Sequence, residues 1–167
     1  MQVVPTSVAS LNVSVHRQIG KRKHMEDRYN IVEFEDDNPG LLAVVCDGHG
    51  GARCANFAVQ YFSEYFTHIR RSNPTRRVKT WMSMALSKTC KYWDRVCFDS
   101  TDAPVSQSEI KHFFDSRDED LYGKRQLDSG STFLALYLQK NNNSYHILNL
   151  GDSQIMFGKE GNWKFSK

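Results

Sequence analysis

The chain has 167 residues, of which 40% are hydrophobic and 25% are charged, and its formal net charge is +3. This length suits one domain, residues 1–167, and the composition is typical of globular proteins rather than of disordered or fibrous ones. The charge is too small for the dense basic surface of a nucleic-acid-binding protein, so we expect no nucleic-acid partner. The sequence has neither a signal-peptide pattern nor an apolar run approaching the ~18 residues of a membrane span, so we expect a soluble protein with no membrane partner.

Cysteine usage points to the cellular compartment. The four cysteines lie inside apolar patterns and form no C-x-x-C pair, which indicates reduced and packed thiols. We therefore expect an intracellular protein, cytoplasmic or nuclear. These cysteines are Cys46, Cys54, Cys90 and Cys97.

The first third of the chain has the pattern of three strands. Alternating apolar and polar residues predict a half-buried strand over 11–15 and a second strand over 29–34, with a basic loop around Gly20 between them. A turn at 35–40 then leads into Leu41–Cys46, six apolar residues that suit a strand buried on both faces. Because no helix separates these strands, we expect antiparallel pairing.

Two helices follow. Apolar residues at helical spacing predict a first helix over about 52–71, and Asn73-Pro74 then breaks the chain. A second amphipathic helix is predicted over 78–96, with Trp81 and Trp93 as core anchors.

The second half of the chain returns to strands after a weakly patterned stretch. Residues 98–128 are polar, which is typical of a mobile insertion, with one short helix expected around 109–114. Strands are predicted over 131–139 and 145–150, and a further hairpin over 154–163. Two helices between two such meanders favour an α+β fold in which sheets pack face to face and a helix pair lies outside.

The candidate site begins where the apolar run at 41–46 ends, in Asp47-Gly48-His49-Gly50-Gly51. An acid, a histidine and three glycines coincide there at a strand-to-helix junction, where α/β proteins tend to bind ligands. The alternative is that Asp47 is a structural acid and His49 an ordinary surface or core residue. A dinucleotide-binding loop is a weak alternative, because Arg53 occupies the third glycine position of G-x-G-x-x-G.

Other acidic residues could complete a metal site. Glu26 and Asp27 start the second strand and Asp152 lies in a turn, and carboxylates at strand ends could hold Mg²⁺ or Mn²⁺ together with water. Such a site could activate a water against phosphorus, and Arg22 could clamp phosphate oxygens. Each of these residues could equally be an ordinary solvated charge, and spacing alone does not show that they converge.

Four motifs resemble, in order and spacing, successive motifs of the metal-dependent, type 2C protein serine/threonine phosphatases. The resemblance runs from Leu11 to the end of the chain, and the pairing of R-x-x-M-E-D with D-G-H-G-G is highly specific. The motifs are Arg22-Lys23-His24-Met25-Glu26-Asp27, Cys46-Asp47-Gly48-His49-Gly50-Gly51, Asp128-Ser129-Gly130-Ser131-Thr132 and Asn149-Leu150-Gly151-Asp152-Ser153.

The resemblance implies a fold and a metal centre. Members of the family form a four-layer αββα sandwich with a two-metal centre of Mg²⁺ or Mn²⁺ at one end, so we expect this sandwich in truncated form. By similarity, Asp47 would bridge both metals and the Gly48 carbonyl would bind one of them. Glu26 would serve that metal's shell, Asp27 would support the loop, and Asp152 would hold a third, looser metal.

The resemblance also implies a reaction. A metal-activated water would attack phosphoserine or phosphothreonine of a protein substrate in line, without a phospho-enzyme. His49 would be the general acid that protonates the departing oxygen, and Arg22 would grip the phosphate. Residues 129–132 would fix the strand beneath the site, and Cys46 would be a buried packing residue.

The chain departs from the family after Asp152. The D-G-x-x-D segment and the final D-N pair of the family are absent, so one metal would keep Asp47 as its sole identifiable protein ligand. We expect a fragment of a longer phosphatase. The alternatives are a truncated product completed by a partner chain, and a catalytically inactive pseudophosphatase that binds phosphoproteins.

Two basic clusters, Arg70-Arg71 and Arg76-Arg77-Val78-Lys79, allow a weaker hypothesis. They could form a nuclear-import or phosphoprotein-docking patch. Basic clusters between helices are usually solvated and have no such role.

Overall fold

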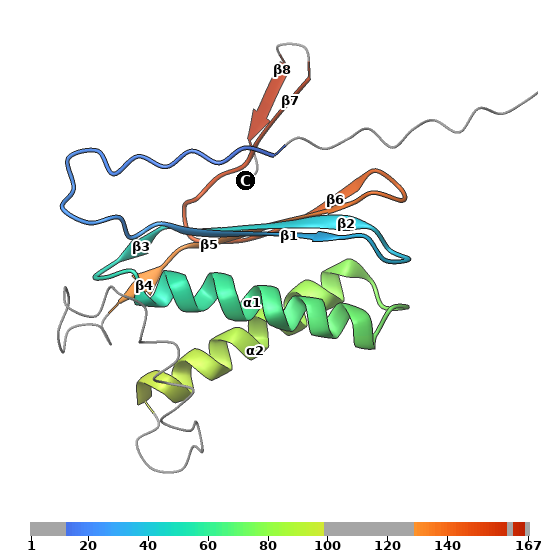
Figure 1. The fold of residues 1–167 in the computed structure, drawn as a ribbon, viewed down its shortest axis with the longest axis horizontal. Helices are drawn as coiled ribbons and strands as arrows, with labels where there is room; N and C mark the ends of the chain where they lie inside the picture. Colours follow the sequence, from blue (N-terminus) through green and yellow to red (C-terminus); the bar gives the residue numbers. More distant parts are fainter. Residues whose placement is uncertain (1–12, 99–128, 160–161, 166–167) are drawn as a thin grey trace, which may run out of the picture.

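An antiparallel sheet of four strands carries two helices on one of its faces (Figure 1). The computed structural model describes residues 13–98, 129–159 and 162–165. Each strand of the sheet pairs antiparallel with its neighbour, which confirms the predicted pairing. In spatial order the strands are β1 (Arg28–Phe34), β2 (Gly40–Cys46), β5 (Phe133–Gln139) and β6 (Ser144–Leu150).

Two short ladders flank the main sheet. One pairs β3 (Gly48–His49) with β4 (Gly130–Ser131), directly after β2 and directly before β5. The other is a hairpin of β7 (Met156–Lys159) and β8 (Asn162–Phe165), which confirms the last predicted hairpin. The β3–β4 ladder therefore lies at the end of the sheet where β2 delivers Asp47.

The two predicted helices are confirmed, as α1 (Arg53–Ser72) and α2 (Val78–Phe98). The connection between them is closed by Asn73, whose N–H donates to the Ile69 carbonyl at 3.0 Å and whose carbonyl accepts from the indole N–H of Trp81 at 2.8 Å. Within the described ranges, neither helix combines the length and the apolarity needed to cross a bilayer.

The core lies between the sheet and the helices. Alternate side chains of β2 and β5 point to this face, because strand side chains alternate between the two faces of a sheet. Trp81 is buried, as predicted, whereas Trp93 is only half-buried against Phe57, with ring centroids 5.1 Å apart. Side chains with no exposed surface include Leu42, Val44, Cys46, Phe62, Phe66, Ala135 and Tyr137.

The opposite face of the sheet is apolar but partly open to solvent. Tyr29, Val45 and Tyr145 are 41%, 45% and 55% exposed there. The prediction that β2 is buried on both faces is therefore wrong at Val45. The reason is that both helices cover the other face, while residues 13–27 and the β7–β8 hairpin lie on the open side (Figure 1).

The expected first strand does not form over the residues that the structure describes. Residues 13–19 have no regular secondary structure, and Val13 and Val15 are each 46% exposed. An alternating pattern becomes a strand only when a neighbouring strand accepts its backbone hydrogen bonds. Leu11 and Asn12, the expected helix at 109–114 and most of the expected insertion at 98–128 lie outside the described residues.

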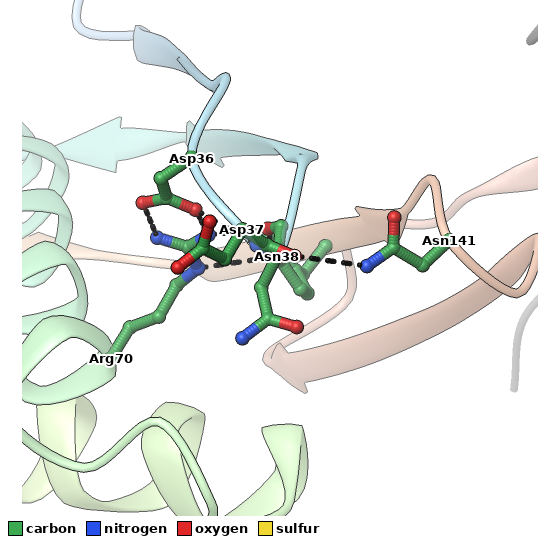
Figure 2. A network of polar contacts seen from close by, with 6 residues as sticks. Asp36, Asp37, Asn38, Arg70 and Asn141 are labelled. Carbon is green, nitrogen blue, oxygen red and sulfur yellow. Dashed lines mark hydrogen bonds and ion pairs between the residues drawn. The ribbon is translucent and has the colours of Figure 1, made fainter.

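A buried arginine ties α1 to the turn between β1 and β2 (Figure 2). Arg70 is 3% exposed, and its guanidinium donates to the Asp36 carboxylate through both terminal nitrogens and also to the Asn38 carbonyl. Its Nε donates to the Tyr137 hydroxyl at 3.2 Å, and its guanidinium carbon lies 4.3 Å from the centre of the Phe34 ring. The hypothesis of a solvent-facing basic patch is therefore wrong for Arg70.

Candidate functional site

Asp47 follows β2 and is held by its backbone. Its N–H donates to Thr132 Oγ1 at 3.0 Å, while its carbonyl accepts from the Thr132 N–H at 2.9 Å and from Ser131 Oγ at 3.1 Å. These contacts join residues 84 to 85 positions apart, and the Asp47 side chain remains exposed. The backbone is therefore fixed while the carboxylate is available to a ligand. The same contacts support the structural role expected of Ser131 and Thr132.

Gly48 allows the backbone of Glu26 to lie close to the residues that follow β2. An added Cβ on Gly48 would lie 2.6 Å from the Glu26 carbonyl oxygen, so only glycine permits this approach of the two backbones. The Glu26 carboxylate then accepts the Gly51 N–H at 2.8 Å. Gly51 has a φ of 120°, which side chains rarely adopt, so the glycine-rich turn can present its N–H in this way.

Asp27 is the acid whose carboxyl group interacts with that of Asp47. Partial burial, followed by the charge of Asp47 and a hydrogen bond with it, raises the pKa of Asp27, and the charges of Arg22 and Arg17 oppose this rise. Two carboxyl groups that share a site repel each other when both are ionised. This pair and the nearby Arg22 guanidinium form the charged centre of the site.

Two arginines outside the predicted site residues, Arg28 and Arg17, hold the acidic segment in place. Arg28 Nη1 donates to the Met25 carbonyl at 2.7 Å and to the Asp27 carbonyl at 2.9 Å, while its Nε donates to Asn56 Oδ1 at 2.5 Å. Arg17 Nη1 also donates to the Asp27 carbonyl, at 3.4 Å. The only signal in the sequence was the position of Arg28 immediately after the acid pair.

His49 lies across the small ladder from Gly130, its register partner. An added Cβ on Gly130 would stand 2.5 Å from His49 Cε1 and closer still to Nε2, so the imidazole lies against the β4 backbone. The residue is nevertheless exposed to solvent. The ring therefore packs against the β4 backbone on one side and remains accessible to solvent on the other.

Asp152 reaches the same end of the sheet through its loop. Ser153 Oγ lies 2.8 Å from Thr132 Oγ1, and an added Cβ on Gly151 would lie 3.0 Å from Thr132 Cγ2. Thr132 thus connects the Asp152 loop to the backbone of Asp47. The Asp152 side chain itself is exposed.

The acids do not gather into a complete metal cage within the described ranges. No group of three or more His, Cys, Asp or Glu side chains there could by itself hold a metal ion. Glu26 contacts the Gly51 N–H through its carboxylate, and Asp27 rather than Glu26 shares hydrogen bonding with Asp47. Cys46, one residue before Asp47, is buried, and burial raises the pKa of its thiol to about 12, in keeping with a packing role.

A model of the protein phosphatase 2C family matches residues 11–166. The chain belongs to the protein phosphatase 2C family. The fold agrees with the expected α+β fold of this family. A solved structure of a C. elegans sex determining protein superposes on the chain with a TM-score of 0.63 at 19% identity, covering 89% of this chain and 32% of that one.

Two curated relatives are named as protein phosphatases. Probable protein phosphatase 2C 52 of Oryza sativa subsp. japonica is 29% identical over 143 residues, which are 85% of this chain and 23% of that protein. Protein phosphatase 1K, mitochondrial, of Xenopus laevis is 40% identical over 53 residues, which are 32% of this chain and 14% of that protein. The chain thus spans less than a quarter of each of these two relatives.

The protein phosphatase 2C family depends on metal ions, generally Mg²⁺ or Mn²⁺. The residues present fit part of such a centre. Mg²⁺ and Mn²⁺ prefer oxygen ligands, and the exposed carboxylate of Asp47 supplies such oxygens, with the carboxyl group of Asp27 interacting with it. A bound divalent cation would neutralise the repulsion between these two acids.

Proposed function

We propose that this chain contributes to a centre that hydrolyses phosphoserine or phosphothreonine in a protein substrate with the help of Mg²⁺ or Mn²⁺. One observation carries the proposal: the Asp47 backbone is clamped at the sheet end, and its carboxylate interacts with Asp27 beside Arg22. Family membership supports the same chemistry. In this proposal, residues 1–167 are part of a single phosphatase domain.

The acidic residues would hold the metal ions. Asp47 and the Gly48 carbonyl would be direct ligands, Glu26 would act directly or through water, and Asp152 would serve a looser third site. Asp27 would support Asp47 through its hydrogen bond. When bound, such ions lower the pKa of water and neutralise charge on a phosphoryl group.

The other two residues would act on the substrate. Arg22 would bind phosphate oxygens, since its planar guanidinium donates two parallel hydrogen bonds to such groups. His49 would give a proton to the departing seryl or threonyl oxygen, a role that needs an accessible imidazole. The exposed position of His49 above β4 is suited to this.

The test is Mn²⁺-dependent release of phosphate from a phosphothreonine peptide. We would assay the chain alone and the chain mixed with the C-terminal part of the domain from the rice relative. The expected result is turnover in at least one of these forms that is lost with EDTA and in Asp47→Asn. If neither form exceeds Asp47→Asn at saturating Mn²⁺, the proposal is rejected.

A second candidate function is a non-catalytic module that binds phosphoproteins. It is favoured by the lack of a three-ligand cluster in the described part of the chain. A phosphopeptide that binds the wild type, but not Arg22→Ala, without any turnover in either assay form would support this alternative. Turnover by the chain alone would exclude it.

A further inference from the structure

In the small ladder of β3 and β4, Gly130 lies opposite His49 and has no role in the proposed reaction so far. The ladder's two register pairs are Gly48 with Ser131 and His49 with Gly130. The imidazole of His49 occupies the space where any other residue at position 130 would carry its Cβ. The absence of a side chain at Gly130 is therefore what lets the ring lie against the backbone.

Space rather than backbone conformation accounts for this glycine. Positive φ angles occur at Gly50, Gly51 and Gly151 in the site, but Gly130 is not among the positive-φ glycines of the described residues. Alanine could adopt the conformation of Gly130 without backbone strain. An added methyl group would meet only the far end of a flexible side chain, so the imidazole would move and the fold would remain.

The β4 segment against which the ring lies is held by hydrogen bonds on both sides of Gly130. Ser129 Oγ accepts the Cys54 N–H at 3.2 Å at the start of α1. Ser131 Oγ donates to the Asp47 carbonyl at 3.1 Å. A methyl group added at position 130 would therefore displace the His49 ring rather than β4, because that strand is tied both to the helix and to Asp47.

We propose that Gly130 is a positioning residue for His49, because it leaves free the space in which the imidazole lies against the β4 backbone. This inference rests on the proposed function, in which His49 is the general acid. In that reaction the water oxygen bonds to phosphorus and the bond from phosphorus to the threonyl oxygen breaks. The threonyl oxygen takes a proton donated by His49, and the proton that the water loses replaces it. The transfer requires the ring within hydrogen-bond reach of the departing oxygen.

The first test measures position and needs no activity. In the full chain labelled with ¹³C and ¹⁵N at histidine, the wild type should show nuclear Overhauser contacts between the His49 ring protons and the Gly130 α-protons. His49→Gln assigns these signals among the six histidines. Gly130→Ala should shift the His49 ring signals and remove the contacts, while the other histidines keep their shifts. Missing contacts in the wild type, or unchanged His49 signals in Gly130→Ala, would overturn the proposal.

The second test uses the leaving group. Gly130→Ala should lower kcat for a phosphothreonine peptide by about 10- to 100-fold with little change in KM, because an alkoxide needs a proton donor. The loss should be much smaller for p-nitrophenyl phosphate, whose leaving group is stable without protonation. A purely structural defect would lower both rates equally, and that result would contradict the proposal.

A double-mutant cycle provides the matched control. If Gly130 acts through His49, Gly130→Ala should change kcat by less than about twofold in a His49→Ala background, because coupled residues are non-additive. Additive losses would contradict the positioning role. If no form of the chain turns over any substrate, the proposed function fails, and the nuclear Overhauser contacts still decide where Gly130 holds the ring.

Discussion

At the scale of single residues, the site depends on close approaches at two glycines. Gly48 is buried against the Glu26 carbonyl, and Gly130 lies under the imidazole of His49. The two glycines differ in what surrounds them. Gly48 faces backbone, which cannot move without the strand, whereas Gly130 faces the end of a side chain.

Gly48→Ala should therefore destabilise the fold. Its Cβ would stand 2.6 Å from the Glu26 carbonyl oxygen, so the start of β1 would have to shift away from β3. We expect the free energy of unfolding in urea to fall by about 1–3 kcal/mol, the usual cost of overpacking. Gly130→Ala is the matched control, and an equal loss in both variants would contradict this explanation.

Asp27 should contribute to divalent-cation binding. Because its carboxyl group interacts with that of Asp47, Asp27→Asn removes negative charge from the proposed metal site. We expect titration calorimetry to show Mn²⁺ affinity lowered by about 10- to 100-fold, as for other residues that support metal ligands. Asp37→Asn, in the exposed turn between β1 and β2, is the control. Equal Mn²⁺ affinity in the wild type and in Asp27→Asn would refute this role.

At the scale of elements, Arg70 holds the last turn of α1 against the opposite end of the sheet from Asp47. Its guanidinium satisfies Asp36, Asn38 and Tyr137 together, and Asn141 Nδ2 donates to the Asp37 carbonyl at 3.2 Å, joining the β5–β6 turn to the same corner (Figure 2). A buried arginine without these partners would carry an uncompensated charge. This corner therefore fixes where α1 lies on the sheet.

The Asp36–Arg70 pair should make stability depend on pH in the acid range. The hydrogen bonds from Arg70, the largest influence, hold the pKa of Asp36 at about 2, below its ordinary value of 3.8. A depressed pKa adds stability that is fully present above the unfolded value and is lost as the pH falls through the folded value. The wild type should therefore have a higher thermal unfolding midpoint than Asp36→Asn. This difference should be constant above pH 5 and mostly lost by pH 2. A difference that does not change with pH would show that folding does not lower the pKa of Asp36.

Removing Arg70 should destabilise the fold more than removing its exposed neighbour Arg71. Arg70→Met keeps the aliphatic stem but leaves the Asn38 carbonyl and the Tyr137 hydroxyl without this donor. We expect a loss of about 1–3 kcal/mol in urea denaturation, the cost of an unsatisfied buried polar group. Arg71→Met, at the exposed neighbouring position, serves as the control. Similar losses in the two variants would contradict a specific role for Arg70.

At the scale of the whole molecule, the sheet has one covered face and one open face. The helices cover the first, and Tyr29, Val45 and Tyr145 remain exposed on the second. Exposed apolar surface and free strand edges favour association. The relatives that match the chain are several times longer, so their remaining residues are available to cover the equivalent face.

The isolated chain should therefore associate as its concentration rises. Val45→Thr combined with Tyr145→Thr keeps strand propensity but removes apolar surface, and it should shift sedimentation towards the monomer. Glu64→Gln, on the exposed side of α1, should leave the sedimentation unchanged. Identical sedimentation of the wild type and the double variant would show that this face does not drive association.

Much of the fold could be predicted from local patterns. The strand around Ile31 and both helices follow from apolar periodicity, because a period of two or of 3.6 residues places one set of side chains on one face. The strands around Val44 and Leu136 follow instead from continuous apolar runs. The strand expected over 11–15 could not be judged in this way. Its formation depends on a pairing partner, and the described residues 13–15 have none.

The sequence by itself determined both helices, most of the strands, the family and the identity of the candidate acids, because these depend on residue types and their spacing along the chain. Only the tertiary structure decided that Asp27 shares hydrogen bonding with Asp47, that Thr132 joins the Asp152 loop to Asp47, and that Gly130 makes room for His49. It also showed that Arg70 is buried in an ion pair rather than exposed on a basic patch. These contacts join residues tens of positions apart, and no periodicity in the chain records how such segments pack against one another.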